Sequence, residues 1–324
     1  MVINIAKPVV VGSFIGTCVA GAFLIKDYFG GKKYEGEELV EGKVVIITGA
    51  NTGIGREAAL ELAKRKAKVV MACRDIAKCE KAREDIVLQT KNKFVYCRSC
   101  NLASQESIRT FADRFKKEHQ RLDILINNAG VMRCPFSRTV EGIEMQLGVN
   151  HMGHFLLTNL LLDRLKESVP SRIINVSSTA HKRGKIKKDD LNSEKNYDAG
   201  EAYNQSKLAN ILFTKELAMR LQGTGVTVNA VHPGIVDTEI TRHMSIFNSY
   251  IAAIFVKPFM WLFTRTPQQG AQTLLYAALL PELEKVSGKY FSNCEEAEVS
   301  QQAEEDKTAL WLWLVSEKWT RLTS

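Results

Sequence analysis

The sequence predicts an α/β fold: a single domain built on a doubly wound, parallel β-sheet of about seven strands. Two observations predict it. Short runs rich in Val and Ile alternate along the chain with longer segments of helical periodicity, which is typical of right-handed βαβ units. The runs are also apolar at nearly every position, as expected of strands that helices cover on both faces. The expected strands are 43–48, 68–73, 93–100, 122–127, 171–178, 226–234 and 288–292.

The segments between these strands have apolar residues at helical spacing. No internal repeat and no second domain is apparent, so residues 43–324 are expected to form one unit. The clearest expected helices are REAALELAKR, SIRTFADRFKKEHQ, MGHFLLTNLLLDRL and AYNQSKLANILFTKELAMRLQ.

The N-terminal segment has a different composition from the rest. Residues 8–25 contain no charged side chain. As a helix they would be about 27 Å long, close to the thickness of a bilayer core. Lysines flank the run, and more of them follow it than precede it, which favours the cytoplasmic side for the bulk of the chain. We therefore expect a membrane-anchor helix at 1–27 and a linker at 28–42; a signal peptide cleaved near 20–22 is the alternative.

Charge and cysteine content exclude several classes of function. The chain has 44 Lys and Arg against 36 Asp and Glu, a net charge of +8. This excess suits a phosphate-bearing ligand or an anionic membrane surface, and it is too diffuse to indicate nucleic acid. The seven cysteines are irregularly spaced and predict no disulfide framework. Cys97 and Cys100 form a C-x-x-C pair without a second pair for zinc, so we expect buried free thiols. His151, His154 and His181 lack a metal-type grouping, and no metal is expected.

A glycine-rich turn, TGANTGIG at 48–55, joins the first strand to the first helix. Its glycines let the backbone turn sharply and approach a ligand closely. The N-terminus of the helix that follows offers free N–H groups and a partial positive charge to a pyrophosphate. A glycine turn between a strand and a helix therefore predicts a dinucleotide site on a Rossmann-type sheet.

Five further motifs follow the glycine turn along the chain: NNAG (127–130), Asn150 in VNHMGHF, VSS (176–178), YNQSK (203–207) and HPG (232–234). Together with TGANTGIG, these motifs resemble the short-chain dehydrogenase/reductase family, in its order and spacing, over residues 41–292. The long segment between VSS and the tyrosine, which opens with Ala180-His181, is similar to the retinol dehydrogenase branch. KDYFGG and AGVMRCP look most like its mitochondrial-type members. The resemblance implies an oxidoreductase that transfers a hydride to or from a nicotinamide dinucleotide.

The end of the second strand is expected to select the cofactor. An acidic residue there would bind the ribose 2′-hydroxyl, whereas the planar guanidinium of Arg74 can bind a 2′-phosphate. We therefore predict NADP(H), with Arg56 nearby; Asp75 is the residue that would favour NAD(H). Asn101 stands where the family usually has Asp on the adenine side. The expected cofactor-binding residues are Gly49, Asn51, Thr52, Gly53, Ile54, Gly55, Arg74, Asn101, Leu102, Asn128, Ala129, Gly130, Tyr203, Lys207, Pro233, Gly234, Val236 and Thr238.

Tyr203 and Lys207 are the expected reacting pair. Hydride transfer to a carbonyl leaves negative charge on its oxygen, which a tyrosine hydroxyl can protonate. A lysine ammonium four residues on lies on the same helix face, and we expect it to lower the pKa of the tyrosine. A second Tyr-x-x-x-Lys match, Tyr28 and Lys32, lies in the linker beside two glycines and has no helix to align it.

Two further residues complete the expected catalytic set. Ser178 ends an expected strand and would contact the substrate carbonyl together with Tyr203; Ser177 is the alternative, because both hydroxyls can fill the role. By resemblance, Lys207 would also bind the nicotinamide ribose, and Asn150 would hold a water of the proton relay. His232 is expected to be structural.

The apolar segment 239–268 is expected to cap the substrate. Phe259, Trp261 and Phe263 could line an apolar pocket, enter a bilayer interface or form ordinary helix core. With the anchor, this segment favours a lipophilic substrate. By resemblance, we expect an NADP(H)-dependent enzyme that interconverts retinal-like aldehydes or ketones and their alcohols at the endoplasmic reticulum or the inner mitochondrial membrane.

The sequence leaves two alternative functions open. One is a steroid or other lipid carbonyl reductase, because the composition of segment 239–268 does not identify the lipid. The other is a membrane-tethered dinucleotide-binding scaffold without turnover, which an intact Tyr203–Lys207 pair disfavours. A homodimer is compatible with the sequence but is not indicated by it.

Overall fold

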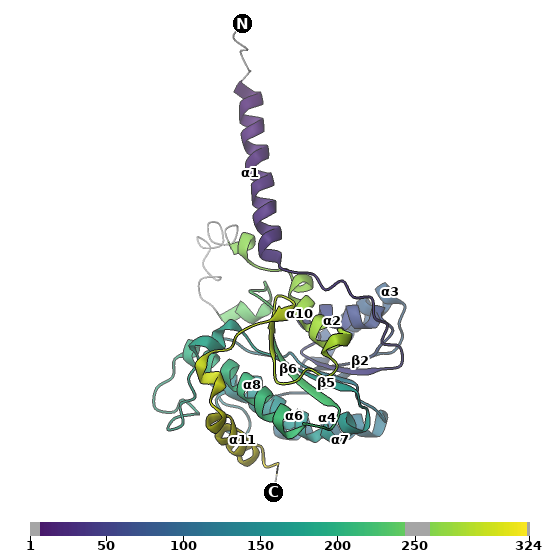
Figure 1. Cartoon of the computed structure of the whole chain (residues 1–324), viewed down its shortest axis with the longest axis vertical. Coiled ribbons are helices and arrows are strands. Elements are labelled where there is room, and N and C mark those ends of the chain that lie inside the picture. The colour runs from purple at the N-terminus through teal and green to yellow at the C-terminus, as the bar shows by residue number, and fades with distance from the viewer. Residues whose placement is uncertain (1–6, 244–259, 323–324) are drawn as a thin grey trace.

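The computed structural model describes residues 7–243 and 260–322 of the chain, and its centre is an eight-stranded sheet (Figure 1). The strand order is β3-β2-β1-β4-β5-β6-β7-β8. β2 and β3 follow β1 on one side and β4 to β8 follow it on the other, which is the doubly wound pattern. The strands are β1 (Val44–Thr48), β2 (Lys68–Cys73), β3 (Val95–Ser99), β4 (Ile124–Asn127), β5 (Ser171–Val176), β6 (Val226–His232), β7 (Tyr290–Ser292) and β8 (Glu295–Glu296).

The first seven strands are parallel, as the sequence predicts. The eighth strand was not predicted. It turns back through Asn293 and Cys294, both with a φ of 57°, and pairs antiparallel with β7. Its two residues are both exposed glutamates, so it carries no apolar pattern that could have marked it.

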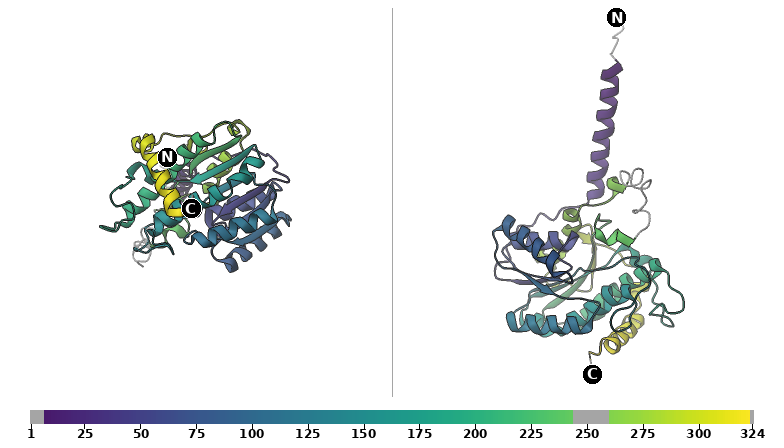
Figure 2. Two further views of the ribbon diagram at one scale, coloured as in Figure 1. Left: turned by 90° about the horizontal axis from the view of Figure 1, so that it is seen from below. Right: turned by 180° about the vertical axis from the view of Figure 1, so that it is seen from behind.

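Helices cover both faces of the sheet, which explains why the central strands β1 and β4 are buried at every position (Figures 1 and 2). On one face the buried core joins the sheet to three helices, and on the other face to four, with the C-terminal helix packed outside them. The first group is α2 (Gly53–Lys64), α3 (Ile76–Thr90) and α10 (Pro267–Leu279); the second is α4 (Gln105–Glu118), α6 (Gly153–Leu160), α7 (Leu162–Glu167) and α8 (Ala199–Arg220), with α11 (Asp306–Thr320) outside.

The helical stretch before β5 begins earlier than predicted. Instead of starting at Met152, it opens with α5 (Met145–Leu147), passes through a π-turn, η1 (Gly148–Met152), and continues into α6. Glu144 caps its first turn by accepting hydrogen bonds from the N–H groups of Gln146 and Leu147. A π-turn shifts the register of the helix by one residue, and such turns are common at functional sites.

Short 3₁₀ turns complete the chain where it leaves the regular elements. They matter because two of them border the site described below. They are η2 (Thr179–Arg183), η3 (Glu239–His243), η5 (Pro281–Leu283) and η6 (Gln301–Glu304).

The N-terminal helix α1 (Lys7–Gly30) extends away from the sheet, and its end is fastened to the segment before α10 (Figure 1). Lys26 Nζ donates to the carbonyl of Trp261 at 2.6 Å, and Arg265 Nε donates to the carbonyl of Phe29 at 3.2 Å. Within the described residues, no helix meets the length and apolarity needed to cross a bilayer. The membrane anchor at 1–27 therefore stays a prediction.

One cysteine prediction was wrong. Cys97 does not carry a free thiol but forms a disulfide with Cys79, whose Cα atom is 6.0 Å away. Cys79 lies in the first turn of α3 and Cys97 on β3, and α3 packs against β3. The pairing depends on a helix facing its neighbouring strand, so spacing along the chain could not indicate it. Cys100 is a buried free thiol, as predicted.

Candidate active site

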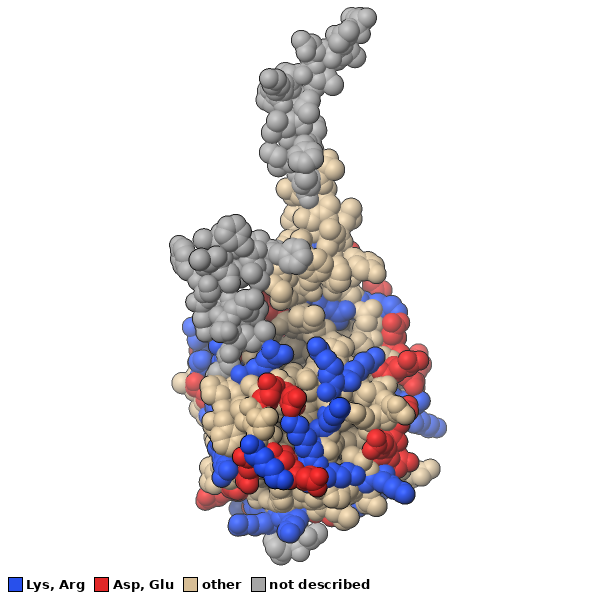
Figure 3. Space-filling view, turned by 90° about the vertical axis from the view of Figure 1, so that its left-hand side faces the viewer, with Lys and Arg blue, Asp and Glu red and all other residues tan. Residues whose placement is uncertain are grey.

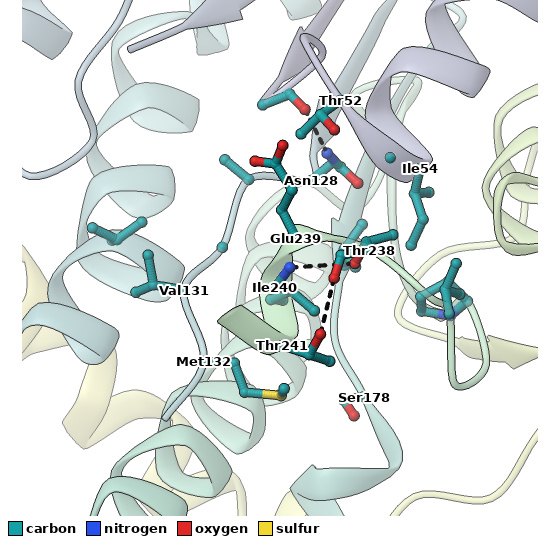
Figure 4. A pocket seen from close by; sticks show the side chains of 18 of the residues that line it. Thr52, Ile54, Asn128, Val131, Met132, Ser178, Thr238, Glu239, Ile240 and Thr241 are labelled. Atoms are coloured by element: carbon teal, nitrogen blue, oxygen red, sulfur yellow. Dashed lines mark hydrogen bonds between the residues drawn. The ribbon is translucent and has the colours of Figure 1, made fainter. Parts of the chain in front are cut away.

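A cavity of about 480 Å³ opens at the carboxyl ends of the central strands (Figure 4). This is the edge where parallel α/β sheets bind their ligands. Gly55 and Asn150 lie beside the cavity rather than on its wall. The other predicted site residues all line it: Gly49, Asn51, Thr52, Gly53, Ile54, Arg74, Asn101, Leu102, Asn128, Ala129, Gly130, Ser178, Tyr203, Lys207, Pro233, Gly234, Val236 and Thr238.

The glycine turn has little space for side chains. Gly49 has a φ of +66°, and a Cβ there would lie 3.0 Å from the Cα of Ala129. Gly53 has a φ of +56°, and a Cβ there would lie 3.0 Å from the Thr238 methyl group. Both the backbone conformation and the close neighbours therefore require glycine, and the N-terminus of α2 faces the cavity.

The Thr48 hydroxyl connects the glycine turn, which begins at the end of β1, with the NNAG turn. It accepts hydrogen bonds from the backbone N–H groups of Asn128 and Ala129, each at 2.9 Å. It also lies 2.9 Å from His154 Nε2, while His154 Nδ1 lies 3.0 Å from the Asn150 carbonyl. Because that carbonyl only accepts, Nδ1 carries the proton and Nε2 accepts from Thr48. Burial lowers the pKa of His154 to about 4, which keeps this ring neutral.

Tyr203 and Lys207 come from the second and third turns of α8, and both are buried. Lys207 Nζ lies 5.7 Å from the centre of the Tyr203 ring and donates to the Val176 carbonyl at 3.1 Å. Burial raises the pKa of the Tyr203 hydroxyl to about 12, although its hydrogen bond with Ser178 and the charge of Arg133 act in the opposite direction. Burial lowers the pKa of the Lys207 ammonium to about 8.

This electrostatic balance differs from the expectation that Lys207 would lower the pKa of Tyr203. For both groups the loss of solvation outweighs the effect of any neighbouring charge. The tyrosine is therefore a protonated donor, and the lysine can change its charge near neutral pH.

The two candidate serines have different surroundings. The Ser177 hydroxyl donates to the Lys207 carbonyl at 2.8 Å and is only 2% exposed. The Ser178 hydroxyl accepts from the Ala180 N–H and acts to lower the pKa of Tyr203, with which it shares the cavity. Ser177 is thus occupied in holding α8 against β5, and the geometry favours Ser178 as the residue that faces a ligand.

Asn150 lies in the π-turn and is fully buried. Its Oδ1 accepts from the Val131 N–H, and its Nδ2 donates to the Val131 carbonyl and to the Ser206 hydroxyl, each at 2.9 Å. A Cβ on Gly130 would lie 3.3 Å from Asn150 Oδ1 and 3.8 Å from Lys207 Nζ. Asn150 therefore fixes the strand-end segment that passes next to Lys207.

At the opposite end of the cavity the Arg74 side chain is exposed, and the carboxylate of the neighbouring Asp75 is bonded to a helix instead. The Asp75 carboxylate is the N-cap of α3 and accepts from the Lys78 N–H at 3.0 Å. Lys78, which the sequence reading missed, lines the same wall. Arg56 does not line the cavity, because it pairs with Glu57 and Asp85 on the surface.

The segment after β6 forms the remaining wall. Thr238 accepts a hydrogen bond from the Thr241 hydroxyl at 3.1 Å, and η3 follows directly. Figure 4 shows Glu239 pointing toward Thr52 and Asn128, at the end where the glycine turn offers N–H groups. Glu239 was not predicted, since no motif marks it.

Of the aromatic residues in segment 239–268, the structure describes Trp261 and Phe263, and neither of them lines the cavity. Trp261 packs edge-to-face on Phe23, and Phe263 packs on Phe29, so both contact the end of α1. Phe259, named with them, lies outside the described residues.

No metal site is evident in the described part of the chain. Residues 7–243 and 260–322 hold no group of His, Cys, Asp or Glu suited to a metal ion. On the face drawn in Figure 3, basic and acidic side chains are interspersed.

Comparison with known proteins agrees with this fold and site. The family profile described as short chain dehydrogenase matches residues 43–247. The chain therefore belongs to the short-chain dehydrogenase family.

Its relatives lie in the retinol dehydrogenase branch, as the motifs indicated. The chain is 53% identical to retinol dehydrogenase 13 of Mus musculus, over 94% of this chain and 91% of that protein. It is 54% identical to retinol dehydrogenase 12 of Homo sapiens, over 90% of each chain.

Solved structures support the same assignment. A putative uncharacterized protein from Mycobacterium paratuberculosis has a TM-score of 0.72 and 36% identity, covering 90% of this chain and 98% of that one. The Pseudomonas aeruginosa RhlG/NADP active-site complex has a TM-score of 0.62 and 26% identity, covering 78% and 95%.

The Thr48 network predicts a specific cost for its removal. Thr48→Val deletes the acceptor of two backbone N–H groups and leaves His154 Nε2 without its donor. We expect the free energy of unfolding to fall by about 2–4 kcal/mol and cofactor affinity to fall as well. Thr227→Val is the matched control, because the buried Thr227 hydroxyl has no hydrogen-bond partner among the described residues. Denaturant titration compares the two; equal effects would contradict the assignment.

The lowered pKa of Lys207 predicts a pH-dependent stability. Between pH 8 and 10.5 the unfolded chain retains a proton on Lys207 that the folded protein has released. Stability therefore rises with pH across this window, by about 3 kcal/mol relative to Lys207→Met. Urea denaturation of both proteins at several pH values measures the difference. A difference that stays constant from pH 7 to 10 would show that Lys207 titrates normally.

Proposed function

We propose that this protein is a membrane-associated, NADP(H)-dependent oxidoreductase that reduces retinal-like and related lipophilic carbonyls by hydride transfer. The observation that carries the proposal is that Tyr203, Lys207 and Ser178 share one cavity with the glycine turn. A dinucleotide laid from that turn along the strand ends would bring its nicotinamide toward the three polar side chains.

The bound cofactor would supply the hydride, and the protein residues would supply position and a proton. Ser178 and Tyr203 would both donate to the carbonyl oxygen, because their side chains line the same cavity. Tyr203 would then give up its proton as charge develops on that oxygen. Lys207, held by Val176, would stabilise the phenolate that results and contact the nicotinamide ribose.

Asn150 has a defined place in this scheme. Its side chain is saturated by Val131 and Ser206, so it holds the segment Gly130–Val131 next to Lys207. By the resemblance to the family it would also take part in a proton relay through water. Reprotonation of Tyr203 would follow from Lys207, whose lowered pKa lets it release a proton near neutral pH.

The preference for NADP(H) is supported by the charges at the adenine end. Arg74 and Lys78 line the cavity there, and the Asp75 carboxylate is occupied as a helix cap. Two cationic side chains, beside a carboxylate that already caps a helix, favour a 2′-phosphate over a free 2′-hydroxyl. The complex of NADP with the RhlG relative is consistent with this preference.

The substrate class and the membrane rest on other observations. The most similar relatives are named retinol dehydrogenases, and we extend that substrate class to this chain. The apolar run 8–25, the exposed Phe23 and Leu24 of α1, and the half-exposed Trp261 favour a membrane-associated enzyme. The endoplasmic reticulum and the inner mitochondrial membrane are the two locations proposed.

A steroid or other lipid carbonyl reductase is the second candidate, because the described cavity walls of Val131, Met132 and Ile240 are apolar but not specific in shape. Purified protein with NADPH and a panel of all-trans-retinal, steroid ketones and short aldehydes separates the two. Robust turnover of a steroid with none of retinal would favour the second candidate.

The proton-donor role predicts a clear phenotype for Tyr203→Phe. This variant should bind NADPH with unchanged affinity but reduce all-trans-retinal at least about 100-fold more slowly, because general acid catalysis is lost. Tyr28→Phe is the control: Tyr28 belongs to the other Tyr-x-x-x-Lys match and is 82% exposed. Fluorescence titration measures binding, and the loss of NADPH absorbance measures turnover. Retained reduction by Tyr203→Phe would refute the role.

The cofactor proposal predicts a selective loss of NADPH affinity. Arg74→Ala and Lys78→Ala should each raise the dissociation constant of NADPH by about tenfold or more and leave that of NADH nearly unchanged, since only NADPH presents a 2′-phosphate. Lys81→Ala, an exposed lysine on the same helix outside the cavity, is the matched control. Tighter binding of NADH than of NADPH by the unaltered protein would overturn the preference.

A further inference from the structure

A buried histidine contacts the backbone of Ser178. His181 is in η2, three residues after the serine, and its side chain is fully buried. Its Nδ1 lies 2.6 Å from the Ser178 carbonyl, and its Nε2 accepts a hydrogen bond from the Ser300 N–H at 3.3 Å. A carbonyl can only accept and an amide N–H can only donate, so the two contacts together require the neutral ring with the proton on Nδ1.

The same ring connects the end of β5 with the C-terminal part of the chain. It packs edge-on against Tyr290 of β7, with 4.9 Å between ring centres, and Ser300 directly precedes η6. The hydroxyls of Tyr290 and Ser300 are buried and have no hydrogen-bond partner in the described structure. His181 therefore links the two parts: its Nδ1 bonds to Ser178, and its Nε2 bonds to Ser300 in the C-terminal part of the chain.

Ser178 needs such support because of its distance from Tyr203 along the chain. The whole of segment 179–202 separates the two residues, so no short loop fixes one against the other. The Ser178 backbone is extended, with a φ of −163° and a ψ of 159°, and its hydroxyl caps η2 through Ala180. The orientation of the Ser178 peptide sets the direction of the hydroxyl. The carbonyl of that peptide accepts two hydrogen bonds from residue 181, one from the backbone N–H at 3.0 Å and one from Nδ1 of the ring at 2.6 Å, and only the second depends on the side chain.

We propose that His181 is a positioning residue: its imidazole fixes the Ser178 peptide from behind and so aims the Ser178 hydroxyl at Tyr203 and at the substrate carbonyl. The inference rests on the proposed function. It also makes residues 290–300 part of the support of the reacting site, although none of them lines the cavity.

The test compares two substitutions of His181. His181→Asn keeps a side-chain N–H near the position of Nδ1 and can still donate to the Ser178 carbonyl, whereas His181→Leu has a similar size and cannot. We expect His181→Leu to lower kcat for carbonyl reduction roughly tenfold or more, with the dissociation constant of NADPH within about twofold, and His181→Asn to restore most of kcat. His119→Leu, on a histidine remote from the cavity, controls for the loss of an imidazole. Equal losses in the Leu and Asn variants, or an unchanged kcat in both, would overturn the proposal.

A double-mutant cycle distinguishes positioning from general stabilisation. In a Ser178→Ala background, His181→Leu should have little further effect on kcat, because the hydroxyl that it positions is gone. The same fold-loss in both backgrounds would show that His181 acts independently of Ser178.

Failure of the proposed function would give a different result, since the unaltered protein would then reduce no carbonyl with NADPH. The inference can still be tested in that case by ¹⁵N NMR of histidine-labelled protein. A neutral His181 ring protonated on Nδ1 at pH 7 is expected; a ring protonated on Nε2 would refute it.

Discussion

The site depends on one buried hydrogen-bond chain that crosses the central strands. It runs from the N–H groups of Asn128 and Ala129 to the Thr48 hydroxyl, through His154, to the Asn150 carbonyl. Every donor and acceptor in the chain has a fixed role, because its ends are backbone groups. These hydrogen bonds join β1, β4 and the π-turn η1. These three elements carry the glycine turn, the NNAG turn and Asn150, respectively. A neutral His154 is essential to it, and burial keeps the ring neutral.

The reacting groups are placed in a region where solvation has been removed from both of them. This raises the pKa of Tyr203 and lowers that of Lys207, so each is biased toward its uncharged form. Such a pair is suited to passing a proton, because neither group is locked into a charge by its surroundings. The charge that develops on a substrate oxygen, and the charges of a bound dinucleotide, would then determine the protonation state. The expectation from spacing alone, a lysine that simply lowers the tyrosine pKa, left out burial.

The sequence predicted the seven parallel strands and the residues around the cavity because these are encoded locally. Val/Ile runs, the glycine turn and the Tyr203–Lys207 spacing each depend on a few neighbouring residues. Features that depend on packing between distant segments could not be predicted in this way. The Cys79–Cys97 disulfide needs α3 to face β3, and the place of Glu239 depends on how η3 folds over the cavity. The contacts of His181 could not be predicted for the same reason, because its partner Ser300 lies 119 positions away.

The contacts of Arg265 extend this reasoning to the N-terminal helix. Its guanidinium donates to the Phe29 carbonyl at the end of α1, to the Pro233 carbonyl at 3.3 Å, and to Asn293 Oδ1 at 2.8 Å. Its backbone pairs with Ile235 and Asp237, on the segment that forms one wall of the cavity. A single side chain thus ties α1 to the cavity wall and to the turn between β7 and β8. If α1 is seated in a bilayer, its position is transmitted to that wall through backbone carbonyls, which a change of side chain in α1 would not alter. The position of the end of α1 relative to the cavity wall is therefore set by contacts of the folded domain.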